Sequence, residues 1–396
     1  MILREAEAIL QDVLGDTPLD TFLDDILGKR FLKADGKGGA LRAAMMGQDA
    51  EAAILADYAR LAPKIGYHAL KASGPAPEIG PVADAGAFKA KVEAFHANGY
   101  TVRLPEIRSL TPELDRFVRA LELVFHQPVK AEAFWSRGDA RAPVHHDDYD
   151  IIVVQIRGRK RWFISTEPNP LPNAWKSVFD GPPELGAHEV IEVEPGDLLY
   201  LPRGTKHCVD AMADSIHVSI GFVPLTLREA VIACLDHLSD FDRPLREPVG
   251  ARLAAQVARG EFGELPERIR GAVEQLTRAV ASEGFVADAL QRRSSRAIGD
   301  MTKLKPVLPS APLTADTQVK QSPLAVAHLS GGAGRVDFAY PGGHHYIHAG
   351  VTEALAFMVG APEFRVHDIP GAMGHDVRLA LVEKFVTTGF LQVVES

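Results

Sequence analysis

The chain has few cysteines, no long apolar run and no excess of positive charge. Cys208 and Cys234 are its only two cysteines among 396 residues, too few for a disulfide framework. No apolar run approaches the roughly 18 residues of a membrane-spanning helix, and the first residues lack the basic-then-apolar order of a secretory signal. With 43 basic against 52 acidic residues, the formal charge of −9 disfavours a general nucleic-acid-binding role. We therefore expect a cytoplasmic protein without a membrane anchor.

The patterns along the N-terminal part of the chain indicate helices. Residues 3–61 are largely helical in pattern, and a Pro/Gly-rich interval at 73–81 separates them from a further predicted helix at 85–97. Residues 100–104 read as a short strand. Thr111 followed by proline predicts the start of another helix, because threonine is a good N-cap and proline fits the first turn.

Between about residues 129 and 222 the pattern changes to short strands broken by turns. This pattern of short strands and turns is typical of a small double-sheet β barrel. The predicted strands are 151–156, 161–164, 189–193, 197–201 and 216–222.

The C-terminal part returns to helical patterns. The predicted helices are 227–238, an Arg-rich segment at 251–293, 351–358 and 375–388, and a short strand follows Gly389. A Pro/Ser-rich stretch at 306–312 indicates a linker, and the helix, helix, strand order after it resembles a winged-helix module. A chain of this length has room for two or three domains. The predicted divisions are 1–225, 226–312 and 313–396.

A His-x-Asp pair and a distant histidine form a candidate metal site. His145 and Asp147 lie just before a predicted strand rich in β-branched residues, and His207 follows a Pro-Gly-Asp turn and a further strand. Two imidazoles and one carboxylate are the protein ligands of the facial triad that binds non-haem Fe(II) and leaves three positions open. Side chains two apart on a strand share a face, so His145 and Asp147 can project into one cavity.

The residues by themselves leave alternatives open at this site. His146 and Asp148 form an equivalent pair that would face the other way, and strand parity does not choose between the two pairs. A His-x-Asp pair also recurs by chance among loop residues. The apolar strand after the pair and the Pro-Gly-Asp turn before His207 favour the metal site.

Lys160 is a candidate ligand for an anionic co-substrate. It follows the turn at Gly158 and shares a face with Trp162 and Ile164 on the returning strand. A cation beside aromatic and aliphatic walls suits the distal carboxylate of a 2-oxo acid. The neighbouring positions are also cationic: Arg157, Arg159 and Arg161. The residues alone therefore favour a solvated basic turn.

A second histidine cluster lies near the C-terminus. His344, His345 and His348 have spacings that could hold a metal on a helix. The Pro-Gly-Gly sequence just before them and the lack of a fitting carboxylate favour a surface loop.

The motifs around the predicted site resemble a known family. His145-x-Asp147, the Gly158-Arg-Lys-Arg-Trp162 turn, and the segment 194–207, Glu-Pro-Gly-Asp-Leu-Leu-Tyr-Leu-Pro-x-Gly-x-x-His, are similar to the JmjC-type ribosomal oxygenases, or cupin-4 group. The resemblance covers about residues 95–225. It implies an α+β chain with a double-stranded β-helix (jelly roll, cupin) catalytic domain, a helical dimerisation region and a C-terminal winged-helix-like domain. It also implies a homodimer.

The same resemblance implies an activity and assigns residues to it. The expected enzyme is an Fe(II)- and 2-oxoglutarate-dependent dioxygenase that uses O2 to hydroxylate a side-chain carbon of a protein, with ribosomal proteins as the first candidates. The catalytic iron ligands fall on His145, Asp147 and His207, which selects this pair over its neighbour. The co-substrate cation falls on Lys160, and a small hydroxyl position near the co-substrate falls on Ser219.

Departures from the family pattern concern the substrate. Ala133 and Trp135 stand where relatives tend to have polar residues. We expect a protein or peptide substrate and no direct nucleic-acid contact. The alternatives are hydroxylation of a biosynthetic peptide or a small metabolite, or a non-catalytic cupin-like binding module whose winged helix recruits a partner.

Overall fold

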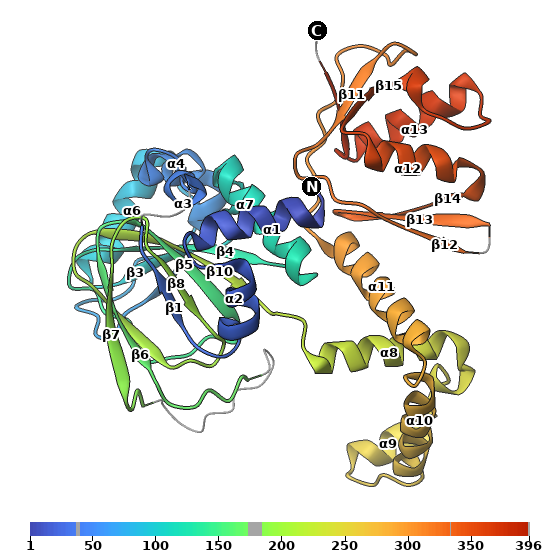
Figure 1. The fold of residues 1–396 in the computed structure, drawn as a ribbon. Coiled ribbons are helices and arrows are strands. Elements are labelled where there is room, and N and C mark those ends of the chain that lie inside the picture. The colour runs from blue at the N-terminus through green and yellow to red at the C-terminus, as the bar shows by residue number, and fades with distance from the viewer. Residues whose placement is uncertain (37–39, 173–183, 333, 395–396) are drawn as a thin grey trace. The chain divides into compact units, whose positions relative to one another are not determined.

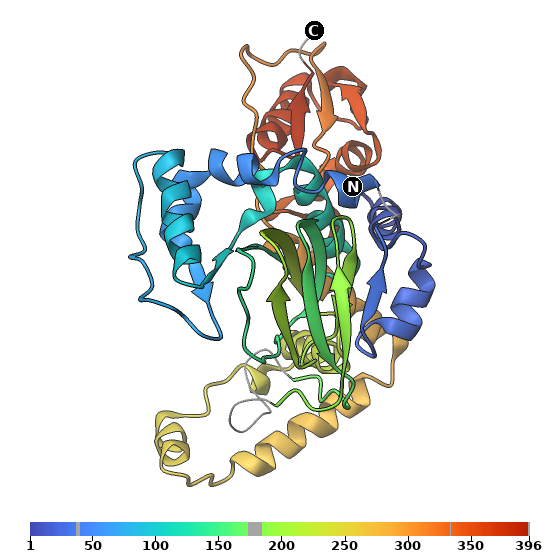
Figure 2. The same ribbon diagram turned by 90° about the vertical axis from the view of Figure 1, so that its left-hand side faces the viewer.

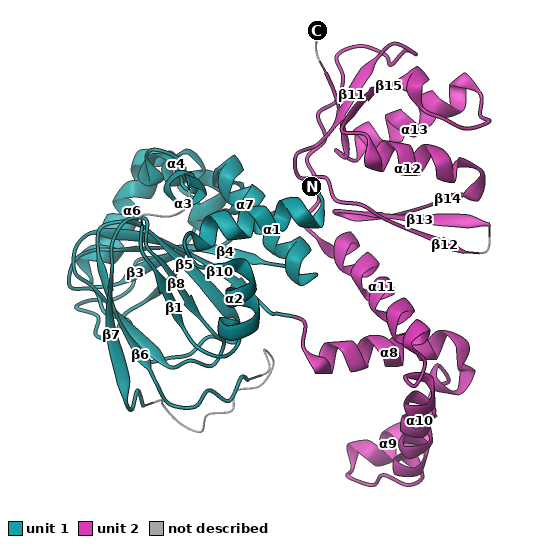
Figure 3. Ribbon diagram, in the orientation of Figure 1, with its two compact units in different colours: residues 1–224 teal, residues 225–396 magenta. Residues whose placement is uncertain are grey.

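The computed structural model describes residues 1–36, 40–172, 184–332 and 334–394. These residues form two compact units, 1–224 and 225–396 (Figure 3). Each unit has its own apolar core. No helix in the described ranges is long and apolar enough to cross a membrane.

Two antiparallel sheets form the centre of the first unit (Figure 1). Their strands are β1 Leu32–Ala34, β2 Gly66–His68, β3 Thr101–Leu104, β4 Lys130–Ser136, β5 Asp150–Arg157, β6 Lys160–Ser165, β7 His188–Val193, β8 Leu198–Leu201, β9 His207–Ala211 and β10 Ser215–Phe222. The larger sheet has seven strands in the order β1-β8-β5-β10-β4-β3-β2, and the smaller has three in the order β7-β6-β9. The predicted double-sheet, cupin-type β fold with mixed helices is confirmed.

The five predicted strands of this region appear as β5, β6, β7, β8 and β10, each within two residues of its predicted bounds. His207 follows β8, as expected, and opens a further strand, β9, that was not among the predicted strands. β8 ends at Leu201, and a turn follows in which Gly204 has a φ of +80°. Glycine adopts this left-handed conformation without the steric cost that a side chain would add.

The helices of the first unit lie around the large sheet (Figure 2). Their bounds are α1 Leu3–Leu14, α2 Leu19–Thr21, α3 Ala40–Ala44, α4 Ala50–Ala56, α5 Tyr58–Leu61, α6 Ala85–Ala97 and α7 Pro112–Phe125. α7 begins as predicted, because the Thr111 hydroxyl accepts a hydrogen bond from the Leu114 N–H at 3.2 Å. The prediction that 3–61 is helical throughout was wrong at β1, which pairs with β8 at the edge of the large sheet.

A tight turn carries the chain from the large sheet into the small one. Gly158, between β5 and β6, has a φ of +67°, and a Cβ built on it would lie 2.0 Å from the carbonyl oxygen of Asp214. Only glycine avoids both the strained φ and this clash. The turn thereby fixes where β6, and with it Lys160, begins.

The second unit begins with helices and ends in a small α/β core. Its elements are α8 Leu227–Phe241, α9 Ala251–Ala258, α10 Leu265–Ala279, α11 Glu283–Asp300, β11 Gln318–Gln321, β12 His328–Gly332, β13 Arg335–Tyr340, β14 Gly343–His348, α12 Thr352–Gly360, β15 Glu363–Arg365, α13 His375–Thr387 and β16 Leu391–Val393. The sheets run β12-β13-β14 and β15-β11-β16. Phe338, Phe385 and Phe390 pack together at the core, with ring centroids 4.5 and 5.1 Å from Phe338.

Several predictions for the second unit are confirmed, and one was wrong. The helices expected at 351–358 and 375–388 are α12 and α13, the terminal strand is β16, and residues 306–312 form neither helix nor strand. The cluster His344, His345 and His348 is not a loop, because it lies in β14 and pairs with β13. His344 Nδ1 lies 3.0 Å from a carboxylate oxygen of Asp337, a partner that only strand pairing brings close.

Candidate metal centre and its pocket

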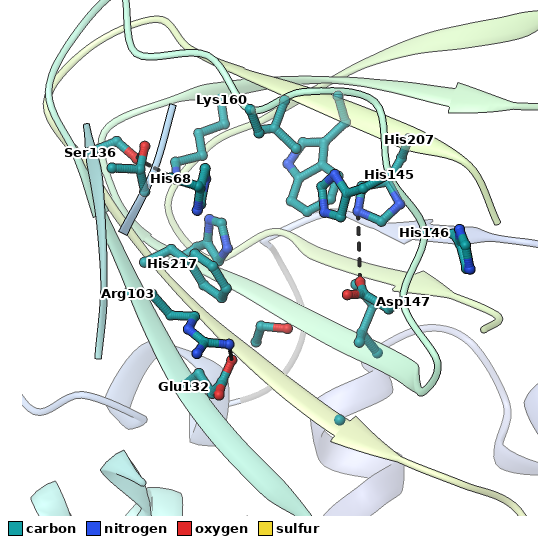
Figure 4. A pocket seen from close by; sticks show the side chains of 18 of the residues that line it. His68, Arg103, Glu132, Ser136, His145, His146, Asp147, Lys160, His207 and His217 are labelled. Carbon is teal, nitrogen blue, oxygen red and sulfur yellow. Dashed lines mark hydrogen bonds and ion pairs between the residues drawn. The ribbon is translucent and has the colours of Figure 1, made fainter. Parts of the chain in front are cut away.

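His145, Asp147 and His207 converge on one point of the first unit (Figure 4). Each offers a ligand atom, and these atoms lie within 4.8 Å of one another. His207 Nε2 is 3.7 Å from Asp147 Oδ2, and the two imidazole centroids are 4.3 Å apart. Among the residues that the structure describes, this is the one group of three or more His, Cys, Asp or Glu side chains with such spacing. The structure thus brings the three predicted ligands together.

Backbone pairing between the two histidines sets their positions. The His145 N–H donates to the His207 carbonyl at 2.9 Å, and the His207 N–H donates back at 2.8 Å. The Nδ1 atoms lie 2.8 Å from the Pro143 carbonyl and 2.9 Å from the Thr205 carbonyl. Since a carbonyl only accepts, each Nδ1 carries the proton, and each Nε2 is left with the lone pair that a metal binds.

The alternative pair lies outside this group. His146 Nε2 is 3.9 Å from an oxygen of Asp148, and neither residue belongs to the cluster of three. Figure 4 shows His146 set apart from the two ligand imidazoles. The alternation expected along a strand does not decide this, because β5 begins only at Asp150 and the metal segment precedes it. The pairing of His145 with His207 decides it instead.

A buried carboxylate, which the sequence did not single out, links the two segments that carry the ligands. Asp150 is fully buried and accepts hydrogen bonds from the Tyr200 hydroxyl and, at 3.3 Å, from the Arg203 N–H. The Gly204 N–H donates to the Asp147 carbonyl at 2.8 Å. These contacts hold the segment before β5 against the turn before β9. The only sequence signal was an acidic residue at the start of an otherwise apolar strand.

A cavity of about 340 Å³ extends from the triad between the two sheets. Its walls come from β2, β3, β4 and β10 on the large sheet and from β6 and β9 on the small one. Arg103 and Glu132 line it as an ion pair, with an N–O distance of 3.6 Å. Ser219 also lines it, on β10 opposite Glu132.

Lys160 is buried in the wall of this cavity, with 2% of its surface exposed. Its Nζ donates to the Ser136 hydroxyl at 2.9 Å, and no ion pair to a carboxylate is present in the described parts of the chain. Burial lowers the pKa of Lys160 to about 7. Trp162 and Ile164 are buried on the same face, as predicted. The solvated-turn interpretation of Lys160 was therefore wrong.

The two residues that depart from the family pattern, Ala133 and Trp135, lie on the face of β4 opposite the pocket. The β4 side chains that line the cavity are Lys130, Glu132, Phe134 and Ser136. Ala133 and Trp135 alternate with them, and Trp135 packs beside His96 on α6, with ring centroids 5.9 Å apart. The pocket side of β4 is therefore polar except at Phe134.

Sequence reasoning missed two imidazoles of the pocket. His217 lies on β10, two residues before Ser219, so strand alternation could have placed both on one face. His68 lies on β2, in a segment without a strand-like pattern. Nothing in the local sequence pointed from His68 to the metal ligands.

Residues 106–230 match the family described as JmjC domain. This segment contains every residue of the triad, together with Lys160 and Ser219. Residues 106–230 are a JmjC domain. His68 and Arg103 precede the JmjC domain, so its pocket is completed by side chains from outside the matched segment.

Proteins similar to this segment include a ribosomal oxygenase and a histidyl-hydroxylase. Ribosomal oxygenase 2 of Rattus norvegicus is 31% identical over 130 residues, 32% of this chain and 28% of that protein. The bifunctional lysine-specific demethylase and histidyl-hydroxylase NO66 of Drosophila willistoni is 30% identical over 136 residues, 33% of this chain and 18% of that protein. The matches thus span less than a third of each of these relatives.

The fold comparison extends beyond the JmjC domain. The crystal structure of Escherichia coli ribosomal oxygenase YcfD covers 96% of this chain and 99% of its own, with a TM-score of 0.54 at 16% identity. YcfD has also been solved in complex with cobalt and 2-oxoglutarate. The likeness at this identity shows a shared fold. Together with the sequence matches, it confirms the resemblance to JmjC ribosomal oxygenases that the motifs indicated.

Proposed function

We propose that the chain is an Fe(II)- and 2-oxoglutarate-dependent dioxygenase that hydroxylates a side-chain carbon of a protein, with ribosomal proteins as the first candidates. The observation that carries the proposal is one cavity with His145, Asp147 and His207 at one place and the buried cation of Lys160 at another. The names of the similar proteins and the complex of YcfD with cobalt and 2-oxoglutarate support it.

The donor set fits a divalent metal. Burial, with His145 beside it, lowers the pKa of His207 to about 4, so this imidazole is neutral at neutral pH and its Nε2 lone pair is able to bind a metal. Two imidazoles and one carboxylate are the protein ligands of non-haem Fe(II) sites and leave positions open. When bound, Fe(II) with 2-oxoglutarate and O2 supplies the oxidation that places a hydroxyl on a carbon atom.

The remaining pocket residues hold and orient the reactants. We propose that Lys160 binds the distal carboxylate of 2-oxoglutarate, with Ser136 fixing the ammonium from the opposite sheet. Ser219 stands on the wall between β4 and β5, where a small side chain leaves room for the co-substrate. The large-sheet wall with Arg103 and Glu132 is left for the substrate.

The second unit supports a proposal of dimerisation through residues 226–312. α10 has no buried residue, yet it carries an apolar stripe at helical spacing, Ile269, Val273 and Leu276, which Val280 extends just beyond the end of the helix. Leu227 and Phe241 at the ends of α8 are 81% and 74% exposed. A second copy of the chain would cover such surface. Residues 313–396, with α12, α13 and β16, are proposed as a winged-helix-like domain.

The decisive experiment measures 2-oxoglutarate turnover. Protein loaded with Fe(II) is incubated with 2-oxoglutarate, O2 and ribosomal proteins, while succinate and the addition of one oxygen atom to any protein are followed by mass spectrometry. His145→Ala and Asp147→Ala should abolish metal binding and turnover. The matched variants His146→Ala and Asp148→Ala should keep the metal, because this pair lies outside the triad.

Each negative result points to a different alternative. Succinate without a modified ribosomal protein would favour a biosynthetic peptide or a small metabolite as substrate. Binding of 2-oxoglutarate without succinate under any condition would favour a binding module. Protein that binds neither metal nor 2-oxoglutarate would contradict the proposal altogether.

A further inference from the structure

Two imidazoles lie beside Lys160 in the part of the pocket away from the metal ligands (Figure 4). Among charged or titratable neighbours, Lys160 acts most strongly on both His68 and His217. His217 is 5% exposed, and its Nδ1 is buried without a hydrogen-bond partner among the residues that the structure describes. Neither imidazole belongs to the metal-binding group.

Aromatic packing holds these imidazoles in place. His217 on β10 lies opposite Phe134 on β4, and the two rings stack with centroids 4.9 Å apart. The His68 ring lies 5.9 Å from the Phe134 ring, and the Trp162 ring lies 5.7 Å from that of His217. The Trp162 Nε1, another donor, is also buried without a partner in the described ranges. The rings are thus fixed by packing, while His217 Nδ1 and Trp162 Nε1 have no hydrogen-bond partner among the described residues.

The buried Trp162 Nε1–H has no acceptor in the described parts of the chain, and each imidazole beside Lys160 has at least one N–H that can donate. A buried donor without a partner is unfavourable, so a ligand that supplies acceptors is favoured. Burial lowers the pKa of His68 to about 4 and that of His217 well below its usual range, so both rings are neutral at neutral pH and each carries one N–H. One buried ammonium, on Lys160, surrounded by neutral donors matches a single carboxylate.

We propose that His217 and His68 join Lys160 and Ser136 in binding the distal carboxylate of the co-substrate, with the His217 ring N–H as a direct donor. The inference rests on the proposed function and names residues that select the co-substrate. His217 makes the pocket specific for 2-oxo acids with a second carboxylate. His68, which precedes the JmjC domain, contributes to the same carboxylate-binding group from β2.

The test compares two ligands that differ only in the distal carboxylate. Mn(II)-loaded full-length protein is titrated calorimetrically with 2-oxoglutarate and with 2-oxopentanoate, which has the same carbon chain without the second carboxylate. A hydrogen bond to a charged group contributes about 1.5–3 kcal/mol, so His217→Leu should weaken 2-oxoglutarate binding roughly ten- to hundredfold. Its affinity for 2-oxopentanoate should stay the same. His217→Asn retains an N–H donor and should restore most of the affinity.

The controls separate contact from folding. His188→Leu makes the same change at an exposed position of β7 and should leave both affinities as in the wild type. Thermal unfolding and Mn(II) affinity are measured for every variant. If His217→Leu does not fold, His68→Leu on the edge strand β2 takes its place, with the same ligand-selective loss expected.

The outcomes are distinguishable. Equal losses for both ligands, or no loss for 2-oxoglutarate, would overturn the assignment of His217 to the distal carboxylate. Wild-type protein that binds Mn(II) but not 2-oxoglutarate would instead defeat the proposed function. A selective loss of 2-oxoglutarate affinity in the His217→Leu variant, restored by asparagine, would confirm that His217 binds the distal carboxylate.

Discussion

Replacing Lys160 by methionine should stabilise the protein while it removes binding of 2-oxoglutarate. Burial lowers the pKa of Lys160 from 10.5 to about 7, and each pKa unit corresponds to about 1.4 kcal/mol. The charged form is therefore disfavoured in the folded protein by roughly 5 kcal/mol. Methionine has a similar shape without the charge, and the lost hydrogen bond to Ser136 costs only about 1 kcal/mol. We expect the metal-free variant to gain about 2–4 kcal/mol in free energy of unfolding at pH 7.

The gain should depend on pH in a defined direction. Between pH 7 and 10.5 the folded wild type carries a neutral Lys160, while the unfolded chain still binds the proton. Because the unfolded state holds more protons, the wild type becomes more stable as pH rises, by up to about 1.4 kcal/mol per pH unit relative to the variant. The advantage of the variant should therefore shrink by about 2 kcal/mol from pH 7 to pH 9. Below pH 7 it should be constant.

The assay is urea unfolding of metal-free protein at pH 6, 7, 8 and 9, followed by tryptophan fluorescence. Lys71→Met, the same change at an exposed lysine, serves as the control and should show no comparable pH dependence relative to wild type. A stability difference for Lys160→Met that does not change between pH 7 and pH 9 would refute the burial argument. Undiminished 2-oxoglutarate affinity would refute the role of the ammonium.

Three further predictions test the supports of the site and the second unit. Asp150→Asn removes the charged acceptor that joins the two ligand segments and should lower both the Mn(II) affinity and the free energy of unfolding, the latter by about 1–3 kcal/mol; an unchanged Mn(II) titration would contradict this role. Gly158→Ala places a Cβ 2.0 Å from the Asp214 carbonyl oxygen at a φ of +67° and should destabilise the protein by more than about 1 kcal/mol in urea unfolding, whereas a wild-type midpoint would show that the turn relaxes freely. Ile269→Asp with Val273→Asp should convert a dimer to a monomer in light scattering without loss of 2-oxoglutarate binding; a monomeric wild type would count against the dimer.

The sequence correctly predicted those helices and strands whose signals lie within a few consecutive residues. α6 has the predicted bounds because Asp84 caps its first turn, accepting a hydrogen bond from the Ala87 N–H at 2.8 Å. The alternating or β-branched runs became β5, β6 and β10. β1 was missed because a strand of three residues has almost no pattern of its own, and it exists through its pairing with β8. The strand β14 was missed for a similar reason, since its histidines lie opposite β13.

The sequence alone determined which functional groups are available at the candidate site. His145, Asp147 and His207 have the donor types of a non-haem iron site, and Lys160 offers a cation for a second anionic group. Which of two His-x-Asp pairs joins His207 in one cluster was decided by the backbone pairing of His145 with His207 in the fold. That pairing joins segments far apart in the chain, so no local pattern encodes it.

Tertiary structure also decided which side chains surround Lys160 in the pocket. The charged residues around Lys160 predicted a solvated turn. In the fold Lys160 is buried, and its ammonium donates a hydrogen bond to Ser136 on β4 of the facing sheet. His68 and His217 reach the same cavity from β2 and β10, at positions that looked unrelated along the chain. Burial and the loss of hydration that shifts these pKa values arise only when distant strands close around a side chain. The sequence determined which groups are available, and the packing of the two sheets determined which of them meet and in which protonation state.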